Sequence, residues 1–179
     1  MTEPMSDAVP PAGAPTDEVP ASQAATWFGV TDEHERVMRL AMAEAARALE
    51  HGDVPVGALV FQGEALISSR HNERELTGDP TAHAEVLALR DAAERLGRWR
   101  LDDCTLVVTL EPCLMCAGAL LNARVASVIY GAADMKAGAC LSLYNVGDDP
   151  RLNHRIDIVP GVLEAECAEL LTSFFAPHR

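Results

Sequence analysis

Two short runs rich in β-branched residues, 105–110 and 125–130, constrain the fold of this chain more than any other feature. Each run is apolar and short, which is typical of a strand buried in a sheet. A helical stretch from Pro112 to about Asn122 joins them, so we expect the two strands to lie parallel in one sheet. Parallel strands need helices to cover the sheet, and the pattern therefore predicts an α/β domain.

The rest of the chain alternates between helical and extended patterns in a way that fits this domain. Thr31 is followed by two acidic residues, a sequence that favours the start of a helix. Asp79-Pro80-Thr81 predicts a second helix start, and Gly97 would close that helix. The remaining predicted elements are a helix from 31 to 52, hairpin strands 56–61 and 65–68, a helix over 82–96, a strand over 156–159 and an amphipathic helix over 163–175.

Length and composition predict one folded domain preceded by a tail. The chain has 179 residues, which suits a single domain, over residues 26–179. Residues 1–25 are rich in Pro, Ala, Ser and Thr and hold few large apolar groups, so we expect them to be disordered. No stretch approaches the roughly 20 apolar residues of a membrane helix, and no secretion signal is recognisable. We therefore expect a cytoplasmic protein that does not associate with a membrane.

The cysteine count and the charge limit the classes of function. Five cysteines, an odd number, argue against a disulfide framework and favour metal binding or catalysis. The net charge of -13 differs from that of a strongly basic nucleic-acid-binding protein. Any contact with RNA must therefore use a local basic patch within an unfavourable overall field.

Two motifs carry the candidate chemistry: residues 83–85 read His-Ala-Glu, and residues 112–116 read Pro-Cys-Leu-Met-Cys. Both lie at predicted helix starts. Cys113 and Cys116 are three residues apart, which places both sulfurs on one face of a helix, and the helix N-terminus favours their thiolate form. His83 adds a nitrogen ligand. Two sulfurs and one nitrogen leave a tetrahedral zinc with one position for water, which is the pattern of a catalytic site.

Glu85 lies two residues beyond His83, so its carboxylate can reach the metal-bound water without being a ligand. Zinc lowers the pKa of such a water, and Glu85 is suited to move its proton to a ring nitrogen and then to a leaving amine. His-x-Glu with Pro-Cys-x-x-Cys is the signature of zinc nucleobase deaminases. A redox cysteine pair or half of a structural zinc site is the alternative interpretation. A structural site needs four protein ligands, and the other cysteines have no paired spacing.

The chain from residue 53 to residue 175 resembles the bacterial tRNA adenosine-34 deaminases of the cytidine-deaminase superfamily. The most specific similar segments are residues 79–85, 109–119 and 152–155, the last reading Leu-Asn-His-Arg. The resemblance implies a three-layer α/β/α fold with a mixed central sheet, and a homodimer. It implies one zinc per subunit held by His83, Cys113 and Cys116, with Glu85 as the proton shuttle.

The resemblance also implies the substrate, which is the anticodon stem-loop of a tRNA, an arginine tRNA above all, with its adenosine flipped into the pocket. The reaction would be hydrolytic deamination of the wobble adenosine to inosine. Leu141 stands where family members usually have Gly, and Arg179 is the only fixed charge after residues 174–175, where the family often has a basic cluster. The implied substrate contacts are the side chain of Asn72, the backbone N–H of Ala84, and Asp134 and Lys136 beside the RNA backbone.

From the residues themselves, further RNA contacts are candidates, each with a plainer alternative. Arginine side chains suit phosphate, and exposed aromatic rings stack on bases. Without the family, Asn72 would be a turn residue, Asp134 and Lys136 solvated loop charges, and the Phe pair core packing of the last helix. The candidates are Arg70, Arg74, Arg151 and Arg155 for a positive groove, and Phe174 or Phe175 for stacking.

Two other functions remain open at this point. A free nucleobase deaminase, with guanine as its substrate, would fit the zinc motif and the acidic charge, whereas residues 153–155 favour the tRNA branch. A non-catalytic subunit that only holds tRNA would not need Glu85, so the presence of this residue counts against that function.

Overall fold

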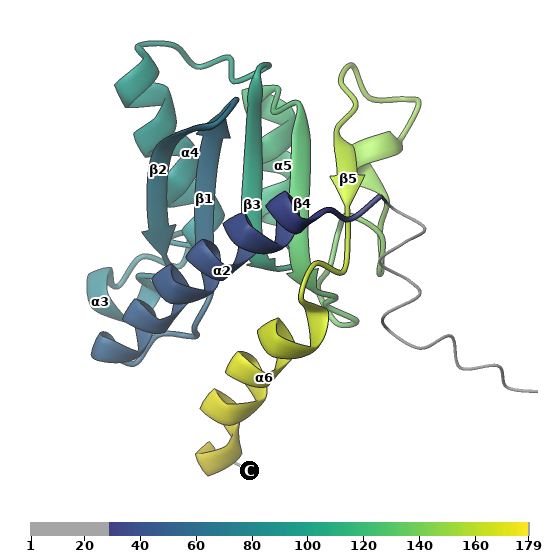
Figure 1. The fold of residues 1–179 in the computed structure, drawn as a ribbon. Coiled ribbons are helices and arrows are strands. Elements are labelled where there is room, and N and C mark those ends of the chain that lie inside the picture. Colours follow the sequence, from purple (N-terminus) through teal and green to yellow (C-terminus); the bar gives the residue numbers. More distant parts are fainter. Residues whose placement is uncertain (1–28, 179) are drawn as a thin grey trace, which may run out of the picture.

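The computed structural model describes residues 29–178 and contains a five-stranded mixed sheet with the strand order β2-β1-β3-β4-β5 (Figure 1). β1 pairs antiparallel with both β2 and β3, whereas β3, β4 and β5 are parallel. The predicted hairpin and the predicted parallel pair are therefore confirmed. The strands are β1 (Gly57–Gln62), β2 (Ala65–His71), β3 (Cys104–Leu110), β4 (Ser127–Ala132) and β5 (Asp157–Val159).

Helices cover both faces of this sheet. Helices α2 and α6 lie on one face and α4 and α5 on the other (Figure 1), which confirms the three-layer α/β/α architecture. The helices are α2 (Asp32–Ala46), α3 (Arg74–Thr77), α4 (Ala84–Leu96), α5 (Leu114–Ala123) and α6 (Glu164–Phe175), with short 3-10 turns at Arg47–His51, Val146–Asp148 and Ala176–His178. Among the described residues, no helix is long and apolar enough to cross a membrane.

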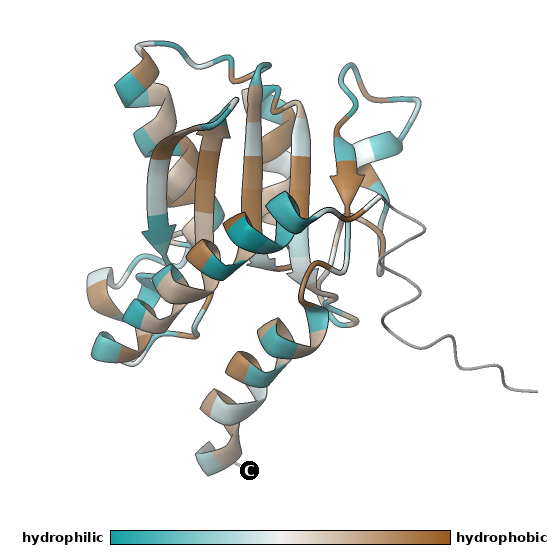
Figure 2. Ribbon diagram, in the orientation of Figure 1, coloured by the Kyte–Doolittle hydropathy of each residue, from teal (hydrophilic) through white to brown (hydrophobic). Residues whose placement is uncertain are grey.

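The two faces of the sheet each hold a separate apolar core, because successive side chains of a strand point to opposite sides. In β3, Leu106 and Val108 pack toward α4 and α5, whereas Val107 packs toward α2 and α6. Each of these three side chains is at most 1% exposed. Figure 2 shows the apolar residues, in brown, along β1, β3 and β4. Burial of this central strand on both faces explains why the consecutive residues 106–108 are all apolar.

Two glycines allow helices of one layer to lie directly on the sheet backbone. A Cβ at Gly57 of β1 would lie 2.2 Å from the carbonyl oxygen of Ala41 in α2. A Cβ at Gly131 of β4 would lie 2.4 Å from the Sγ of Cys167 in α6. Both distances are far shorter than real Cβ contacts, so these positions need glycine to keep the layers this close.

The structure confirms the predicted start of α2 but not that of α4. Thr31 caps α2, and its hydroxyl accepts from the backbone N–H of His34 at 3.3 Å. The predicted cap at residues 79–81 was wrong for α4, which begins at Ala84 with His83 as its N-cap residue. The Asp79 carboxylate instead accepts from the N–H and hydroxyl of Thr81, so it closes its own turn before the helix. The predicted tail, residues 1–25, lies outside the described residues.

Candidate functional site

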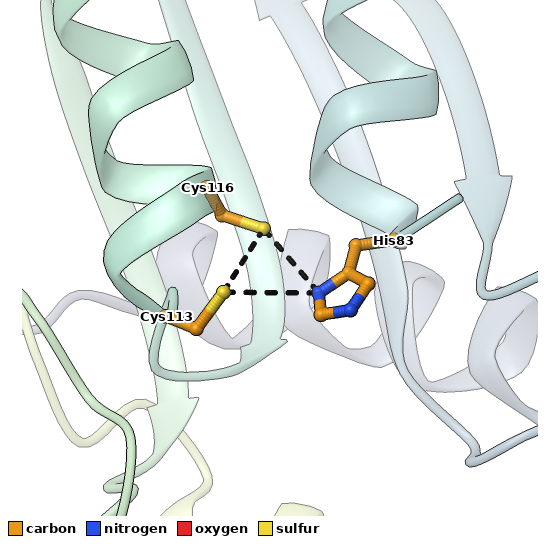
Figure 3. A group of neighbouring side chains, drawn as sticks. All are labelled: His83, Cys113 and Cys116. Atoms are coloured by element: carbon orange, nitrogen blue, oxygen red, sulfur yellow. Dashed lines mark hydrogen bonds between the residues drawn. The ribbon is translucent and has the colours of Figure 1, made fainter. Parts of the chain in front are cut away.

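The three candidate metal ligands meet where two helices begin, at the carboxyl end of β3. His83 and Cys113 are the N-cap residues of α4 and α5, both with extended backbone, and Cys116 lies in the first turn of α5. The Nδ1 atom of His83 lies 3.8 Å from the Sγ of Cys113 and 3.5 Å from that of Cys116 (Figure 3). The two sulfurs lie 3.6 Å apart. The structure thus brings together the group that the sequence spacing predicted.

These distances fit a tetrahedral zinc ion. Zinc bonds of about 2.3 Å to sulfur and about 2.0–2.1 Å to nitrogen, at tetrahedral angles, place the ligand atoms about 3.5–3.8 Å apart. The three separations, 3.5, 3.6 and 3.8 Å, fall in this range. Within residues 29–178, His83, Cys113 and Cys116 form the one such cluster of three metal-binding side chains. The donor set of two sulfurs and one nitrogen also suits zinc, so the residues present fit this metal.

The electrostatics of the cluster favour a thiolate. The hydrogen bond with Cys116 lowers the pKa of the Cys113 thiol to about 3, and the neighbouring His83 acts in the same direction against burial. The hydrogen bond with Cys113 and burial raise the pKa of Cys116, and the Cys113 sulfur raises the pKa of His83. One of the two sulfurs therefore carries a negative charge at neutral pH, as a metal ligand must.

Glu85 lies beside the cluster and is 4% exposed. Burial raises the pKa of its carboxyl, while the nearby His83 opposes this rise. The carboxyl is also close enough to hydrogen-bond with Cys116. A buried carboxyl with a raised pKa next to a metal-binding cluster is a candidate general acid and base.

Asn72 and Ala84, two of the expected substrate contacts, bond to each other in the structure. The N–H of Ala84 donates to the Oδ1 of Asn72 at 2.9 Å, and the Nδ2 of Asn72 donates to the carbonyl oxygen of Val54 at 3.1 Å. Asn72 follows β2 and is 6% exposed. Its amide therefore fixes the start of α4, which carries His83, against the segment before β1.

Sequence reasoning missed Glu111, which is 1% exposed and directly precedes the Pro112-Cys113 segment. Burial alone would raise the pKa of this carboxyl, but its hydrogen bonds to Ser142 and to backbone N–H groups lower it. The available signal was a charged residue at the end of a buried apolar strand. Its partners all lie in the loop of residues 134–142: the N–H groups of Asp134, Cys140, Leu141 and Ser142, and the hydroxyl of Ser142.

Asp134 and Lys136 lie in this 134–142 loop, near the metal cluster. The Oδ1 of Asp134 accepts from the N–H groups of Lys136 at 2.9 Å and Ala137 at 3.1 Å, so this carboxylate closes the loop's own turn. The side chain of Lys136 is exposed. The loop also bonds to the metal-ligand segment, because the N–H of Ala139 donates to the carbonyl oxygen of Pro112 at 2.9 Å.

The four candidate arginines differ in their surroundings. Arg70 is paired with both Asp91 and Glu73, at 2.9 and 2.7 Å. Arg74 is exposed on α3 and close enough to the metal cluster that its charge lowers the pKa of His83. The other two are paired with neighbouring acids: Arg151 with Asp149 and Arg155 with Asp148. Of the four arginines, Arg74 is the one whose charge acts on the pKa of His83.

The segment of residues 152–155 lies at the opposite end of α5 from the metal ligands. The Nε2 of His154 lies 2.7 Å from the carbonyl oxygen of Val125, and Arg124 donates to the Oδ1 of Asn153 at 2.8 Å. Residues 124 and 125 follow the carboxyl end of α5, whereas Cys113 begins it. Within one subunit, this segment therefore anchors the far end of the helix and does not line the metal cluster.

The aromatic pair at the end of α6 is partly exposed. The rings of Phe174 and Phe175 pack edge to face with centroids 5.0 Å apart. Phe175 is 43% exposed, and Phe174 is less so. Core packing was the plainer alternative for this pair, but neither ring is among the buried core residues of the described chain.

Comparison with known proteins places this architecture and cluster in one family. The model of the MafB19-like deaminases matches residues 32–177. A curated relative from Bacillus subtilis (strain 168), named tRNA-specific adenosine deaminase, is 47% identical over 148 residues, which are 82% of this chain and 91% of the relative.

Solved structures agree with this assignment. A structure from a study of A-to-I editing by tRNA:A34 deaminases has a TM-score of 0.72 and 42% identity, covering 75% of this chain and 97% of that chain. A guanine deaminase from Bacillus subtilis is more distant in structure, with a TM-score of 0.53 and 40% identity over 56% of this chain and 64% of that chain. The chain belongs to the MafB19-like deaminase family and, within it, to the tRNA-specific adenosine deaminases.

Proposed function

We propose that this chain deaminates the wobble adenosine of tRNA to inosine by hydrolysis. The observation that carries the proposal is the placement of the buried Glu85 carboxyl beside His83, Cys113 and Cys116. We propose these three side chains as the ligands of one zinc ion per subunit. A non-catalytic subunit that only held tRNA would have no use for a buried carboxyl at this position.

Each group of the chain has a distinct part in the reaction. When bound, zinc supplies Lewis-acid activation of the attacking water. Glu85 accepts a proton from that water as the water oxygen bonds to C6 of the adenine ring, and it delivers the proton to a ring nitrogen. Glu85 then takes the proton of the new C6 hydroxyl group and passes it to the amino group, so that the C6–N bond breaks, the C6 carbonyl forms and ammonia leaves. Burial keeps bulk water away from Glu85 and raises the pKa of its carboxyl, which favours the protonated form that delivers the proton.

The substrate contacts that we propose lie around the same edge of the sheet. Asn72 and the N–H of Ala84 would meet the flipped nucleoside, exchanging part of their mutual hydrogen bonding for bonds to it. Phosphate contacts dominate RNA affinity. Two exposed cations are the candidates for these contacts: Arg74, whose charge acts on His83, and Lys136 in the 134–142 loop. Phe175 is available for stacking. We assign Asp134 to shaping the loop beside the RNA.

We further propose a homodimer that acts in the cytoplasm, where tRNA is used, with an arginine tRNA as substrate. Large exposed apolar side chains mark protein interaction sites. Several occur in or near α5 and the segment that precedes β3: Trp99, Leu114, Met115 and Leu152. Light scattering at micromolar concentration would give the mass of a dimer if this surface is the interface.

The deciding experiment compares substrates side by side at low salt, because contacts between cationic side chains and phosphates weaken as salt rises. We expect inosine in an anticodon stem-loop of an arginine tRNA with adenosine at position 34. We expect none in the same stem-loop with cytidine at position 34, and little ammonia from free adenosine or guanine. An extruded loop base lowers the cost of flipping. Ammonia from guanine together with no inosine in the stem-loop would assign the chain to the guanine deaminases.

A further inference from the structure

We propose that Glu111 is a positioning residue for substrate binding: its buried carboxylate holds the 134–142 loop beside the metal cluster and thereby sets the affinity for RNA. This inference rests on the proposed function. Among the hydrogen bonds of the described residues, none joins Glu111 to the donor atoms of His83, Cys113 or Cys116.

The two carboxylate oxygens of Glu111 together hold both ends of the loop. Oε1 accepts the N–H groups of three consecutive residues, Cys140, Leu141 and Ser142, at 3.0, 2.7 and 2.9 Å. Oε2 accepts the N–H of Asp134 at 3.0 Å and the hydroxyl of Ser142. All five partners are donors, so only an acceptor at both oxygens satisfies them. One carboxylate thus fixes the first and last residues of the turn at the same point.

The loop comes so close to this carboxylate that it needs glycine. A Cβ at Gly138 would lie 2.3 Å from the Oε2 of Glu111 and 2.6 Å from the carbonyl oxygen of Asp134. Gly138 also forms an isolated bridge with Cys113. The carboxylate therefore sets how closely the loop approaches Cys113, the N-cap residue of α5.

Packing on the other side of the loop is incomplete. A hollow of about 390 Å³ borders it there, lined by Met135, Leu141 and Ser142 together with residues from β4 and the start of α6. Met135 is 71% exposed and Leu141 43% exposed. Because apolar contact is sparse on this side, the hydrogen bonds to the buried charge restrain the loop there, whereas Ala139 and Cys140 are buried on its inner side.

A displaced loop would act on binding more than on chemistry. The loop presents the exposed Lys136 side chain, whereas the metal ligands and Glu85 lie at the starts of α4 and α5, which the apolar core on that face of the sheet holds. A change that moves a binding group without moving the reacting groups raises KM and leaves kcat nearly unchanged.

The test is Glu111→Gln in the full-length, zinc-loaded protein, assayed on the adenosine-34 stem-loop. Glutamine keeps one acceptor oxygen but turns an N–H₂ group toward the N–H of Asp134 or toward those of residues 140–142. We expect KM to rise roughly tenfold or more, with kcat within about threefold of the parent and one zinc per chain retained. Hydrogen exchange should become faster in residues 134–142 and stay unchanged in α4.

Two further variants keep the test decisive if Glu111→Gln folds poorly. Gly138→Ala pushes the loop away from an intact carboxylate and should show the same rise in KM. Ser68→Ala is the matched control, because it also removes a buried hydrogen bond, the 2.7 Å bond from its hydroxyl to the Ala88 carbonyl, but at α4. It should lower thermal stability without changing KM.

Three results would overturn the positioning role: unchanged KM in both loop variants, a fall in kcat equal to the fall in kcat/KM, or an equal rise in KM in Ser68→Ala. These results differ from failure of the proposed function, which would appear as the absence of inosine with the parent protein itself.

Discussion

Replacing Glu85 with Gln should separate activity from stability. Glutamine has nearly the same volume, so it leaves no cavity at this 4% exposed position. Burial raises the pKa of Glu85, so its charged form opposes folding increasingly as pH rises from the unfolded pKa toward the folded one. Each unit by which a pKa is raised corresponds to about 1.4 kcal/mol of this penalty, which a neutral amide removes. We therefore expect equal or greater stability at pH 7.

The activity of Glu85→Gln should fall by at least about 10²–10⁴-fold, the contribution typical of one general acid–base group, because this carboxyl serves more than one proton transfer. Single-turnover inosine formation gives the rate, zinc analysis confirms the metal content, and thermal melting gives the stability. A turnover within tenfold of the parent would refute the assignment of Glu85. A melting temperature lowered by 5 °C or more would refute the stability argument, since it would show that the charge of Glu85 stabilises the fold.

Glu44 provides the matched comparison, because it is a second buried glutamate with the opposite shift. Burial would raise its pKa, but hydrogen bonds from His71, Ser69 and Arg47 lower it. Glu44→Gln places an amide N–H₂ against these donors, which should cost about 1–3 kcal/mol and lower the melting temperature by roughly 2–4 °C per kcal/mol. The rate of the chemical step should stay near that of the parent. If Glu85→Gln and Glu44→Gln changed the rate and the melting temperature alike, the distinction between a catalytic and a structural carboxylate would be contradicted.

The remaining expectations concern the metal, acid stability, packing and the tail. X-ray absorption should show a shell of two sulfurs with nitrogen and oxygen, and chelation should abolish activity and lower the melting temperature; three or four sulfurs would contradict a catalytic site. Glu44 and Asp53 have lowered pKa values, so their stabilisation is complete above about pH 4.5 and is lost as pH falls through those lowered values, which melting between pH 7 and 3 would show. Gly57→Ala should destabilise by about 1–3 kcal/mol in urea unfolding, because its Cβ would meet the backbone of Ala41. Deletion of residues 1–25 should leave the melting temperature and zinc content unchanged, and a large loss would contradict the predicted disorder.

The metal cluster and the sheet were predictable because they depend on short-range patterns. Cys113 and Cys116 share one helical turn, which their spacing predicts, whereas His83, 30 residues away, was joined to them through the signature of zinc nucleobase deaminases. The parallel order of residues 105–110 and 125–130 followed from the helix between them. The start of α4 was misplaced because Asp79-Pro80-Thr81 has cap chemistry, which the chain uses for a separate turn.

The contacts around the site were less predictable because they join distant segments. Glu111 bonds to residues 23 to 31 positions further along the chain, in a loop without regular periodicity. The pairing of Arg70 with Asp91 spans 21 positions, so the sequence did not reveal that this cation is already neutralised. The pairing of Arg151 with Asp149 is local, and the adjacent acid was a signal that could have been used.

The 134–142 loop has a consequence for labelling chemistry, because Lys136 is the only lysine of the chain. Its exposed amine is therefore the one side-chain amine that amine-directed acylating reagents can modify, apart from the α-amine at the N-terminus. A fluorophore or spin label attached there would sit on the loop beside the metal cluster without any cysteine being introduced near the metal ligands. Acetylation at the same atom would remove the loop's only cationic side chain, which makes this amine both a reporter position and the point at which a single covalent change alters the local charge.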